Sequence, residues 1–375
     1  MGFIATRLAL LVAVLLACSV ESALLVANTR GNNEIVLIRD NGTASIFYDG
    51  TGLSAPDTIR WWDGYYYIST GTEVDDSSIA RIDVESGEVD LMFAMGGGLK
   101  RPYGYDFDDG KVYVASFMTD EILVYDAATG EFLEVFAQGN ATEEGLVNGP
   151  NQIAIHNGTL YMTTQGSFVD GNGTLQYAFA SQIVAFDLMT GEGYVFAPQP
   201  EVTSAGYISM LGILIGCDEQ SILPDDCTVY TTDYAGGLRL YALATGELLD
   251  FQDTTYVKGS ITGSLTMSST SRELYITGSS ADDNGVIMTY DPDTGGNLTV
   301  IFGPEGGFLS RPIGILYVKD DNVGASPQEP PESGNNDEEE EGSTTSPPSA
   351  GPALPPAVMN WFVVAGALLV CVGVF

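Results

Sequence analysis

Short stretches in which apolar and polar residues alternate run through the middle of the chain. Strict alternation over four to eight residues is typical of a β-strand with one buried face. One such stretch recurs, each time meeting a turn that ends in glycine before alternation resumes. Because glycine readily takes the positive φ that these turns need, each copy predicts a β-hairpin. The copies are residues 78–88, 121–131, 182–192, 238–247 and 286–295.

A second recurring element precedes each hairpin and opens a strand with proline. It is clearest at residues 101–107, 149–155 and 311–318, looser at 55–61, and divergent near Ile208 and Ile261. Successive copies start roughly 46 to 59 residues apart, a period at which four short strands per repeat form the blade of a β-propeller.

The two ends of the repeat region complete each other. Residues 23–52 contain three strand-like runs without an opening strand, and residues 311–318 form an opening strand without partners. Pairing them completes a sixth blade and removes the exposed sheet edges that promote aggregation. We therefore predict an all-β fold over residues 23–324, a six-bladed β-propeller closed by pairing the C-terminal strand with the N-terminal three strands.

Three motifs carry a family resemblance: Pro-x-Gly strand openings, the Lys111-Val-Tyr-Val strand and Tyr-Asp-x-x-Thr-Gly turns. They resemble the NHL-repeat and SMP-30-like six-bladed β-propellers over about residues 23–320. The resemblance supports the fold more than the function, because propellers host many unrelated activities.

The resemblance also implies a metal site. In SMP-30-like enzymes, an Asn at a Pro-Asn strand opening and carboxylates from other blades hold a divalent cation. Asn151 matches that opening, and Asp57 offers a hard oxygen ligand suited to Ca²⁺. Three features depart from the family pattern: Ile313 stands at a matching opening, the N-terminal blade shows no matching Glu, and the remaining channel acid is not identifiable. Capping of strand starts by polar residues is the alternative interpretation.

Propeller topology predicts two different faces. Loops between blades, and between the second and third strands of a blade, surround the channel mouth, where we expect Asp57, Tyr103 and Asn151. The largest insertion on that face, residues 166–181, carries aromatic residues that could cover a ligand; a long surface loop is the alternative. The Thr-Gly turns are expected on the opposite face.

Sequence patterns at both ends of the chain predict a location at the cell surface. Residues 1–22 have the short basic start, apolar run and small-residue exit of a signal peptide; a lipobox-like stretch ending in Cys18 is a rival interpretation. Residues 325–356 are rich in Pro, Glu and Ser, which predicts a disordered acidic stalk. Residues 357–375 form an apolar tail that we interpret as a GPI-anchor signal with attachment at Ser349, or as a membrane helix.

Cysteine usage and glycosylation motifs fit the same compartment. Cys217 and Cys227 are predicted to form one disulfide that closes a short loop on the face opposite the channel mouth. A zinc site is disfavoured, since two cysteines and the single His156 offer too few ligands. Five Asn-x-Thr motifs predict N-glycosylation at Asn41, Asn140, Asn157, Asn172 and Asn297.

Charge narrows the list of partners. The formal net charge of −37 disfavours binding to nucleic acid or anionic lipid headgroups. A salt-adapted microbial surface protein would share this acidity. Catalysis through histidine has little support, because His156 lies beside a predicted Asn-Gly turn and no nucleophile-elbow motif is present.

Two functions follow from these observations. The first is a non-catalytic, extracellular binding or adhesion module for a protein or glycan, held on the outer face of the plasma membrane. The alternative is a Ca²⁺-dependent, SMP-30-like hydrolase of the lactonase or esterase type, with Asp57 and Asn151 as metal ligands. No other cofactor is predicted.

Overall fold

The computed structural model describes residues 22–29, 32–140, 143–202, 207–217, 227–253, 261–280, 284–303, 307–319 and 323. These residues form strands and no helix. No described segment is a helix long and apolar enough to span a membrane. The predicted signal peptide (apart from Ser22), stalk and tail, including Ser349, lie outside the described residues.

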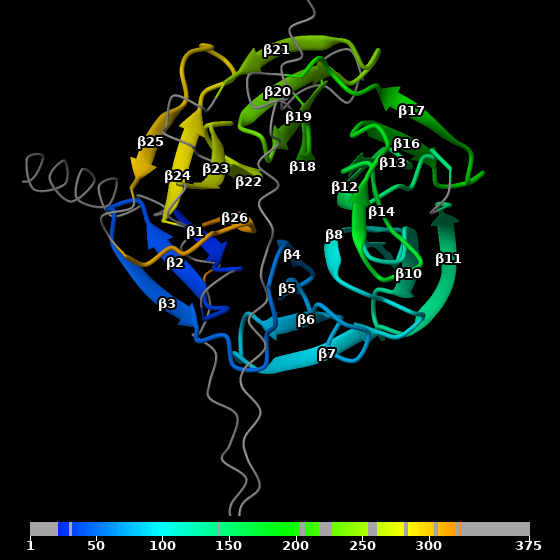
Figure 1. Ribbon diagram of the computed structural model, residues 1–375. Coiled ribbons are helices and arrows are strands. Elements are labelled where there is room, and N and C mark those ends of the chain that lie inside the picture. Colours follow the sequence, from blue (N-terminus) through cyan, green and yellow to red (C-terminus); the bar gives the residue numbers. More distant parts are fainter. Residues whose placement is uncertain are drawn as a thin grey trace, which may run out of the picture. The chain divides into compact units, whose positions relative to one another are not determined.

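Six four-stranded antiparallel sheets surround a central channel, as Figure 1 shows. In each sheet the first strand lies innermost and the fourth lies at the rim. Blade 1 contains β4 (Ile59–Trp62), β5 (Tyr65–Thr70), β6 (Ser78–Asp83) and β7 (Val89–Met95). Blade 2 contains β8 (Pro102–Asp108), β9 (Lys111–Ser116), β10 (Glu121–Asp126) and β11 (Phe132–Gln138).

Blades 3 to 5 repeat this arrangement. Blade 3 contains β12 (Pro150–His156), β13 (Thr159–Thr164), β16 (Ile183–Asp187) and β17 (Gly193–Ala197). Blade 4 contains β18 (Met210–Cys217), β19 (Cys227–Asp233), β20 (Gly237–Ala242) and β21 (Leu248–Gln252). Blade 5 contains β22 (Ile261–Met267), β23 (Leu274–Ser279), β24 (Gly285–Tyr290) and β25 (Thr299–Phe302).

Blade 6 closes the ring as predicted. Its inner strand β26 (Ile315–Lys319) pairs antiparallel with β1 (Ser22–Ala27), which continues to β2 (Ile35–Arg39) and β3 (Ala44–Tyr48). The register runs from Ser22 opposite Lys319 to Val26 opposite Ile315. The six-bladed β-propeller is therefore confirmed. Strand β1 begins at Ser22, one residue earlier than the predicted boundary of the propeller, because Ser22 pairs with Lys319 of β26.

The hydrophobic core lies between neighbouring blades, because each strand turns alternate side chains toward opposite faces of its sheet. Tyr66 and Tyr67, consecutive in β5, illustrate this arrangement. Tyr66 packs edge-on against Phe47 of blade 6, whereas Tyr67 packs against Phe107 of blade 2. Both tyrosines are buried, so each blade is held by apolar contacts on its two sides.

The repeated Thr-Gly turns join the third and fourth strands of the blades. Together with the hairpins between first and second strands they form what we call the turn face. In four copies an aspartate at the start of the turn accepts backbone N–H groups from the next residues, and these hydrogen bonds within the turn lower the pKa of each carboxyl group. The four are Asp83, Asp126, Asp187 and Asp291.

Candidate binding face at the channel mouth

The opposite face, which we call the channel face, contains the loops between blades and the loops between second and third strands. Asp57, Tyr103 and Asn151 occupy equivalent positions in blades 1, 2 and 3, at this end of the inner strands. Each lies two residues before an apolar residue that recurs in the inner strands: Ile59, Tyr105 and Ile153. In blades 4, 5 and 6 that position holds Leu211, Gly263 and Ile313.

The residue before the opening proline has an unusual backbone in four blades. Ala55, Arg101, Gly149 and Arg311 all have φ between 45° and 62°. Non-glycine residues in this region carry strain that persists only when surrounding contacts hold it. The backbone N–H of Arg101 donates to Ser77 Oγ (3.0 Å). This hydrogen bond holds the strained backbone of Arg101 at the channel face.

Hydroxyl groups tie neighbouring inner strands together. Thr163 Oγ1 accepts a hydrogen bond from the Gln152 backbone N–H (3.1 Å) in its own blade, and donates to the Leu211 carbonyl of the next blade. Thr232 does the same with Gly212 and Gly263. The other two blade-bridging hydroxyls are Ser69, between Thr58 and Tyr103, and Thr277, between Ser264 and Ile313. The equivalent residues in blades 2 and 6 are Ala115 and Ala27.

Asp57 is buried inside the channel, with 5% of its surface exposed. Its Oδ1 accepts a hydrogen bond from Gln152 Nε2 (3.1 Å), and the same amide donates to Thr58 Oγ1. Burial raises the pKa of Asp57 to about 7, against the opposing effects of the Arg101 charge and these hydrogen bonds. The carboxyl group of Asp57 thus lies beside hydrogen-bond donors.

The residues around Asp57 fit a calcium ion poorly. Ca²⁺ takes about six to eight oxygen ligands. Asp57 and Asn151 provide two side chains, and Tyr103, Leu211, Gly263 and Ile313 at the equivalent positions add no carboxylate. Within the described part of the chain, Asp57 belongs to no group of three His, Cys, Asp or Glu side chains close enough to share an ion. The metal site therefore stays a prediction.

Deeper in the channel, an arginine joins three inner strands. Arg60 of β4 donates from Nε to the Tyr105 carbonyl (2.7 Å) and from Nη2 to the Ile153 carbonyl (2.6 Å). Its Nη1 lies 3.8 Å from Asp106 Oδ1, and the other oxygen of Asp106 accepts the Ile155 backbone N–H (2.8 Å). Side chains therefore occupy this part of the channel between blades 1, 2 and 3.

A pocket of about 540 Å³ opens on the channel face beside blades 3 and 4. Aromatic residues from three segments line it: Tyr177 and Phe179 from the insertion, Tyr207 from the loop before β18, and Tyr234 from the loop after β19. Tyr177 and Tyr207 are 64% and 48% exposed. The insertion forms its own hairpin, β14 (Ser167–Val169) with β15 (Leu175–Tyr177), which places Tyr177 at the pocket.

Both channel-face arginines lie beside these rings. Arg311 Nη2 donates to the Tyr234 hydroxyl (2.7 Å). The Arg101 guanidinium carbon lies 5.5 Å from the ring centroid of Tyr103, which packs on Phe117 at 4.7 Å. Partial loss of hydration raises the pKa of the Tyr177 phenol, and Arg101 is close enough to oppose that rise. The mouth therefore combines aromatic surface with positive charge in a strongly acidic protein.

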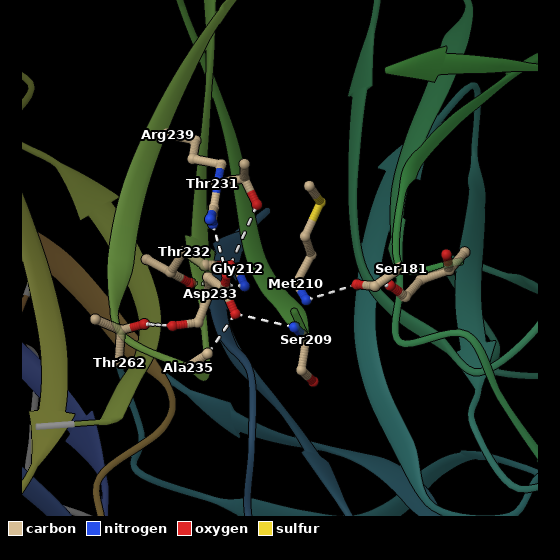
Figure 2. Close-up of polar contacts among 11 residues, drawn as sticks. Ser181, Ser209, Met210, Gly212, Thr231, Thr232, Asp233, Ala235, Arg239 and Thr262 are labelled. Atoms are coloured by element: carbon tan, nitrogen blue, oxygen red, sulfur yellow. Dashed lines mark hydrogen bonds and ion pairs between the residues drawn. The ribbon is translucent and has the colours of Figure 1, made fainter. Parts of the chain in front are cut away.

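A buried ion pair supports the blade 4 side of the pocket (Figure 2). Arg239 Nη1 lies 2.6 Å from Asp233 Oδ2, and the two side chains are 2% and 1% exposed. Asp233 Oδ1 accepts hydrogen bonds from the backbone N–H groups of Ser209 (2.9 Å) and Ala235 (3.0 Å). Ser209 follows Tyr207 closely in the sequence, and Ala235 follows Tyr234 directly. The pair thus fixes the two loops that carry these pocket tyrosines.

The turn face holds the disulfide. Cys217 and Cys227 are bonded, as predicted, and join the end of β18 to the start of β19. Their sulfur atoms lie near the imidazole of His156, but both cysteines are used in the disulfide, so this cluster offers no thiolate to a metal. The predicted N-glycosylation sites are all exposed: Asn41, Asn157 and Asn297 on the turn face, Asn140 and Asn172 on the channel face. Their modification stays a prediction.

Sequence reasoning missed Tyr207, Tyr234 and the blade-bridging hydroxyls. A usable signal was present for the hydroxyls, because second strands end in similar sequences after a tyrosine: Tyr67-Ile-Ser-Thr, Tyr161-Met-Thr-Thr, Tyr230-Thr-Thr-Asp and Tyr275-Ile-Thr-Gly. No comparable signal marks the pocket, since its tyrosines come from loops that differ between blades.

Comparisons with known proteins support the fold alone. No protein-family profile and no curated protein matches the chain. A chain in the crystal structure of a nidogen/laminin complex is 15% identical, covers 79% of this chain and 98% of that chain, and superposes with a TM-score of 0.56. The designed Ika8 protein is 14% identical with a TM-score of 0.40, and covers 75% of each chain. The fold is that of a six-bladed β-propeller, and membership of the NHL or SMP-30 families stays an expectation.

Proposed function

We propose that this chain is an extracellular binding module that presents its channel face to a partner protein or glycan, and that it is held on the outer face of the plasma membrane. The observation that carries the proposal is the aromatic pocket at the channel mouth. Tyr177 and Tyr207 expose large ring surfaces there, on loops fixed by the blades beneath. Exposed aromatic residues on a rigid scaffold are typical of recognition surfaces.

Two further observations support a binding role. The chain similar in fold belongs to a nidogen/laminin complex, which supports the proposal of a protein partner for this chain. The signal-peptide, stalk and tail patterns of the sequence support the cell-surface location.

Binding of the labelled full chain to cell surfaces tests this function. We expect saturable binding that falls at least tenfold when Tyr177 and Tyr207 are both replaced by alanine. Tyr194→Ala is the matched control, because Tyr194 is 53% exposed but lies on the outer strand β17. Equal loss in the control, or no saturable binding by the unaltered chain, would contradict the proposal.

A Ca²⁺-dependent hydrolase is the second candidate, favoured by one observation. Asp57 and Asn151 lie at equivalent positions at the same end of the channel, and burial raises the pKa of Asp57 to about 7, near that of a useful acid or base. Turnover of an ester or lactone panel that depends on Ca²⁺, and that Asp57→Ala and Asn151→Ala both abolish, would favour this candidate. Turnover and metal binding unchanged in both variants would remove it.

A further inference from the structure

The pocket on the channel face mixes ring surfaces with uncharged hydrogen-bonding groups. Three tyrosines offer both a ring face and a hydroxyl, and Gln165 and Gln199 add amides. Gln199 Oε1 accepts the Ser181 backbone N–H (2.8 Å), so its Nε2 is the donor left for an occupant. The Gln165 side chain makes no hydrogen bond with any described residue. The lining therefore offers several donors and acceptors beside aromatic surface.

These groups disfavour a wholly apolar occupant. Burying an amide or hydroxyl without a hydrogen-bond partner is unfavourable, because the group loses its hydrogen bonds to water. An apolar side chain of a partner would desolvate the glutamine amides and tyrosine hydroxyls without replacing their hydrogen bonds. A pyranose ring fits both parts of the lining, because its C–H face stacks on aromatic rings and its hydroxyls hydrogen-bond with amides and phenols.

Charge disfavours an ionic occupant. Among the described residues, no charged side chain lines the pocket. The nearby carboxylate of Asp233 is already paired with Arg239 and two backbone N–H groups. A cation would approach Arg311, which donates to the Tyr234 hydroxyl, and an anionic glycan would find no charged hydrogen-bond donor in the lining itself.

We infer, resting on the proposed binding function, that this pocket binds a neutral hexose unit of an oligosaccharide, either free or attached to a partner protein. Its volume of about 540 Å³ lies within the range of about 300–1,000 Å³ that is usual for small-molecule sites. Tyr177 and Tyr207 stack on the sugar, and Gln165 and Gln199 set its orientation.

Titration calorimetry of the full chain tests the inference. The probes are neutral tri- and tetrasaccharides of glucose, galactose, mannose and N-acetylglucosamine, with sialylated and sulfated counterparts as charged probes. We expect at least one neutral probe to bind saturably, with affinity reduced at least tenfold by Tyr207→Ala and by Gln165→Leu but unchanged by Tyr194→Ala. Thermal unfolding of each variant establishes that it is folded.

Three results would overturn the inference: binding of charged probes alone, no binding of any neutral probe, or equal loss in Tyr207→Ala and Tyr194→Ala. Enzymatic removal of glycans from a captured partner separates the two proposals. If the stripped partner still binds through Tyr207, the sugar inference is wrong and the binding function stands. If neither sugars nor a partner bind, both are wrong.

Discussion

At the level of single residues, the aspartates of this chain divide into two classes with opposite effects on stability. Turn-face aspartates such as Asp126 are partly exposed and accept hydrogen bonds from backbone N–H groups, which lowers the pKa of each carboxyl group. Asp57 is buried among neutral donors, and its pKa is raised to about 7. Carboxyl groups of the first class stabilise the fold when they are ionised, whereas the fold is more stable when Asp57 is protonated.

Asp57 makes stability fall as pH rises. Its pKa is about 3.9 in the unfolded chain, so the folded chain holds the extra proton between pH 4 and 7. The stabilisation is complete below pH 4 and is lost as pH rises through 7. At pH 8 we expect the free energy of unfolding of Asp57→Asn to exceed that of the unaltered chain by about 1–4 kcal/mol. At pH 4 the two free energies should be nearly equal.

Urea unfolding at both pH values measures this difference. Asp126→Ala serves as the control, because hydrogen bonds within the turn lower the pKa of that carboxyl group below its ordinary value, so it stays ionised in the folded chain at both pH values and its deficit should be nearly equal at pH 8 and pH 4. If Asp57→Asn shows the same pH dependence as the unaltered chain, the buried and protonated state assigned to Asp57 is wrong.

The buried pair Asp233–Arg239 has a different signature. Arg239→Met leaves the Asp233 carboxylate buried without its cation, which should lower the free energy of unfolding by about 3–5 kcal/mol. The double variant with Asp233→Asn should recover part of that loss, since no unpaired charge remains. Denaturant titrations of both chains check this, and a double variant less stable than Arg239→Met would count against the electrostatic explanation.

At the level of strands, the bridging hydroxyls explain how blades with bulged inner strands join. Blades 2 to 5 share a register shift at the start of the inner strand, which leaves a backbone N–H facing the second strand. Thr163, Thr232 and Thr277 satisfy that N–H in blades 3, 4 and 5. Blade 2 has the bulge but carries Ala115.

Ala115→Ser should therefore supply a missing bridge, with its hydroxyl placed to bond Gly104 N–H and the Asn151 carbonyl. We expect a gain of about 0.5–1.5 kcal/mol in the free energy of unfolding. Ala80→Ser is the control, since Ala80 of β6 is equally buried but packs in the hydrophobic core, away from any bridging position. Chemical unfolding that shows equal effects of the two substitutions would refute the bridging role.

The same strands show how far sequence reasoning reaches. The repeat period and the alternation predicted the blades, the closure of the ring and the disulfide, because each depends on residues close in sequence or on one recurring pattern. The pocket was not predictable in this way. Tyr177, Tyr207 and Tyr234 come from three loops, and only the geometry of blades 3 and 4 brings them together. The sequence predicted Asp57 as a metal ligand, but its contact with Gln152 was not predictable, because Gln152 lies in blade 3 and Asp57 in blade 1.

At the level of the whole molecule, the two faces of the ring differ in chemistry. The turn face repeats at least one aspartate or glutamate at each Thr-Gly turn, whereas the channel face, which also carries carboxylates, gathers Tyr177, Tyr207 and two arginines around one pocket. The insertion hairpin β14–β15 adds to the channel face alone. This asymmetry is why the binding function is assigned to one face.

Steric shielding of each face tests that assignment most directly. Glu201→Asn creates the glycosylation motif Asn-Val-Thr beside the pocket residue Val202, and Pro292→Asn creates Asn-Asp-Thr in a turn-face loop. Mass measurement establishes that each new site carries a glycan. We predict that the glycan at position 201 abolishes saturable binding to cell surfaces and that the glycan at position 292 leaves it intact; loss of binding at position 292 alone would contradict the account.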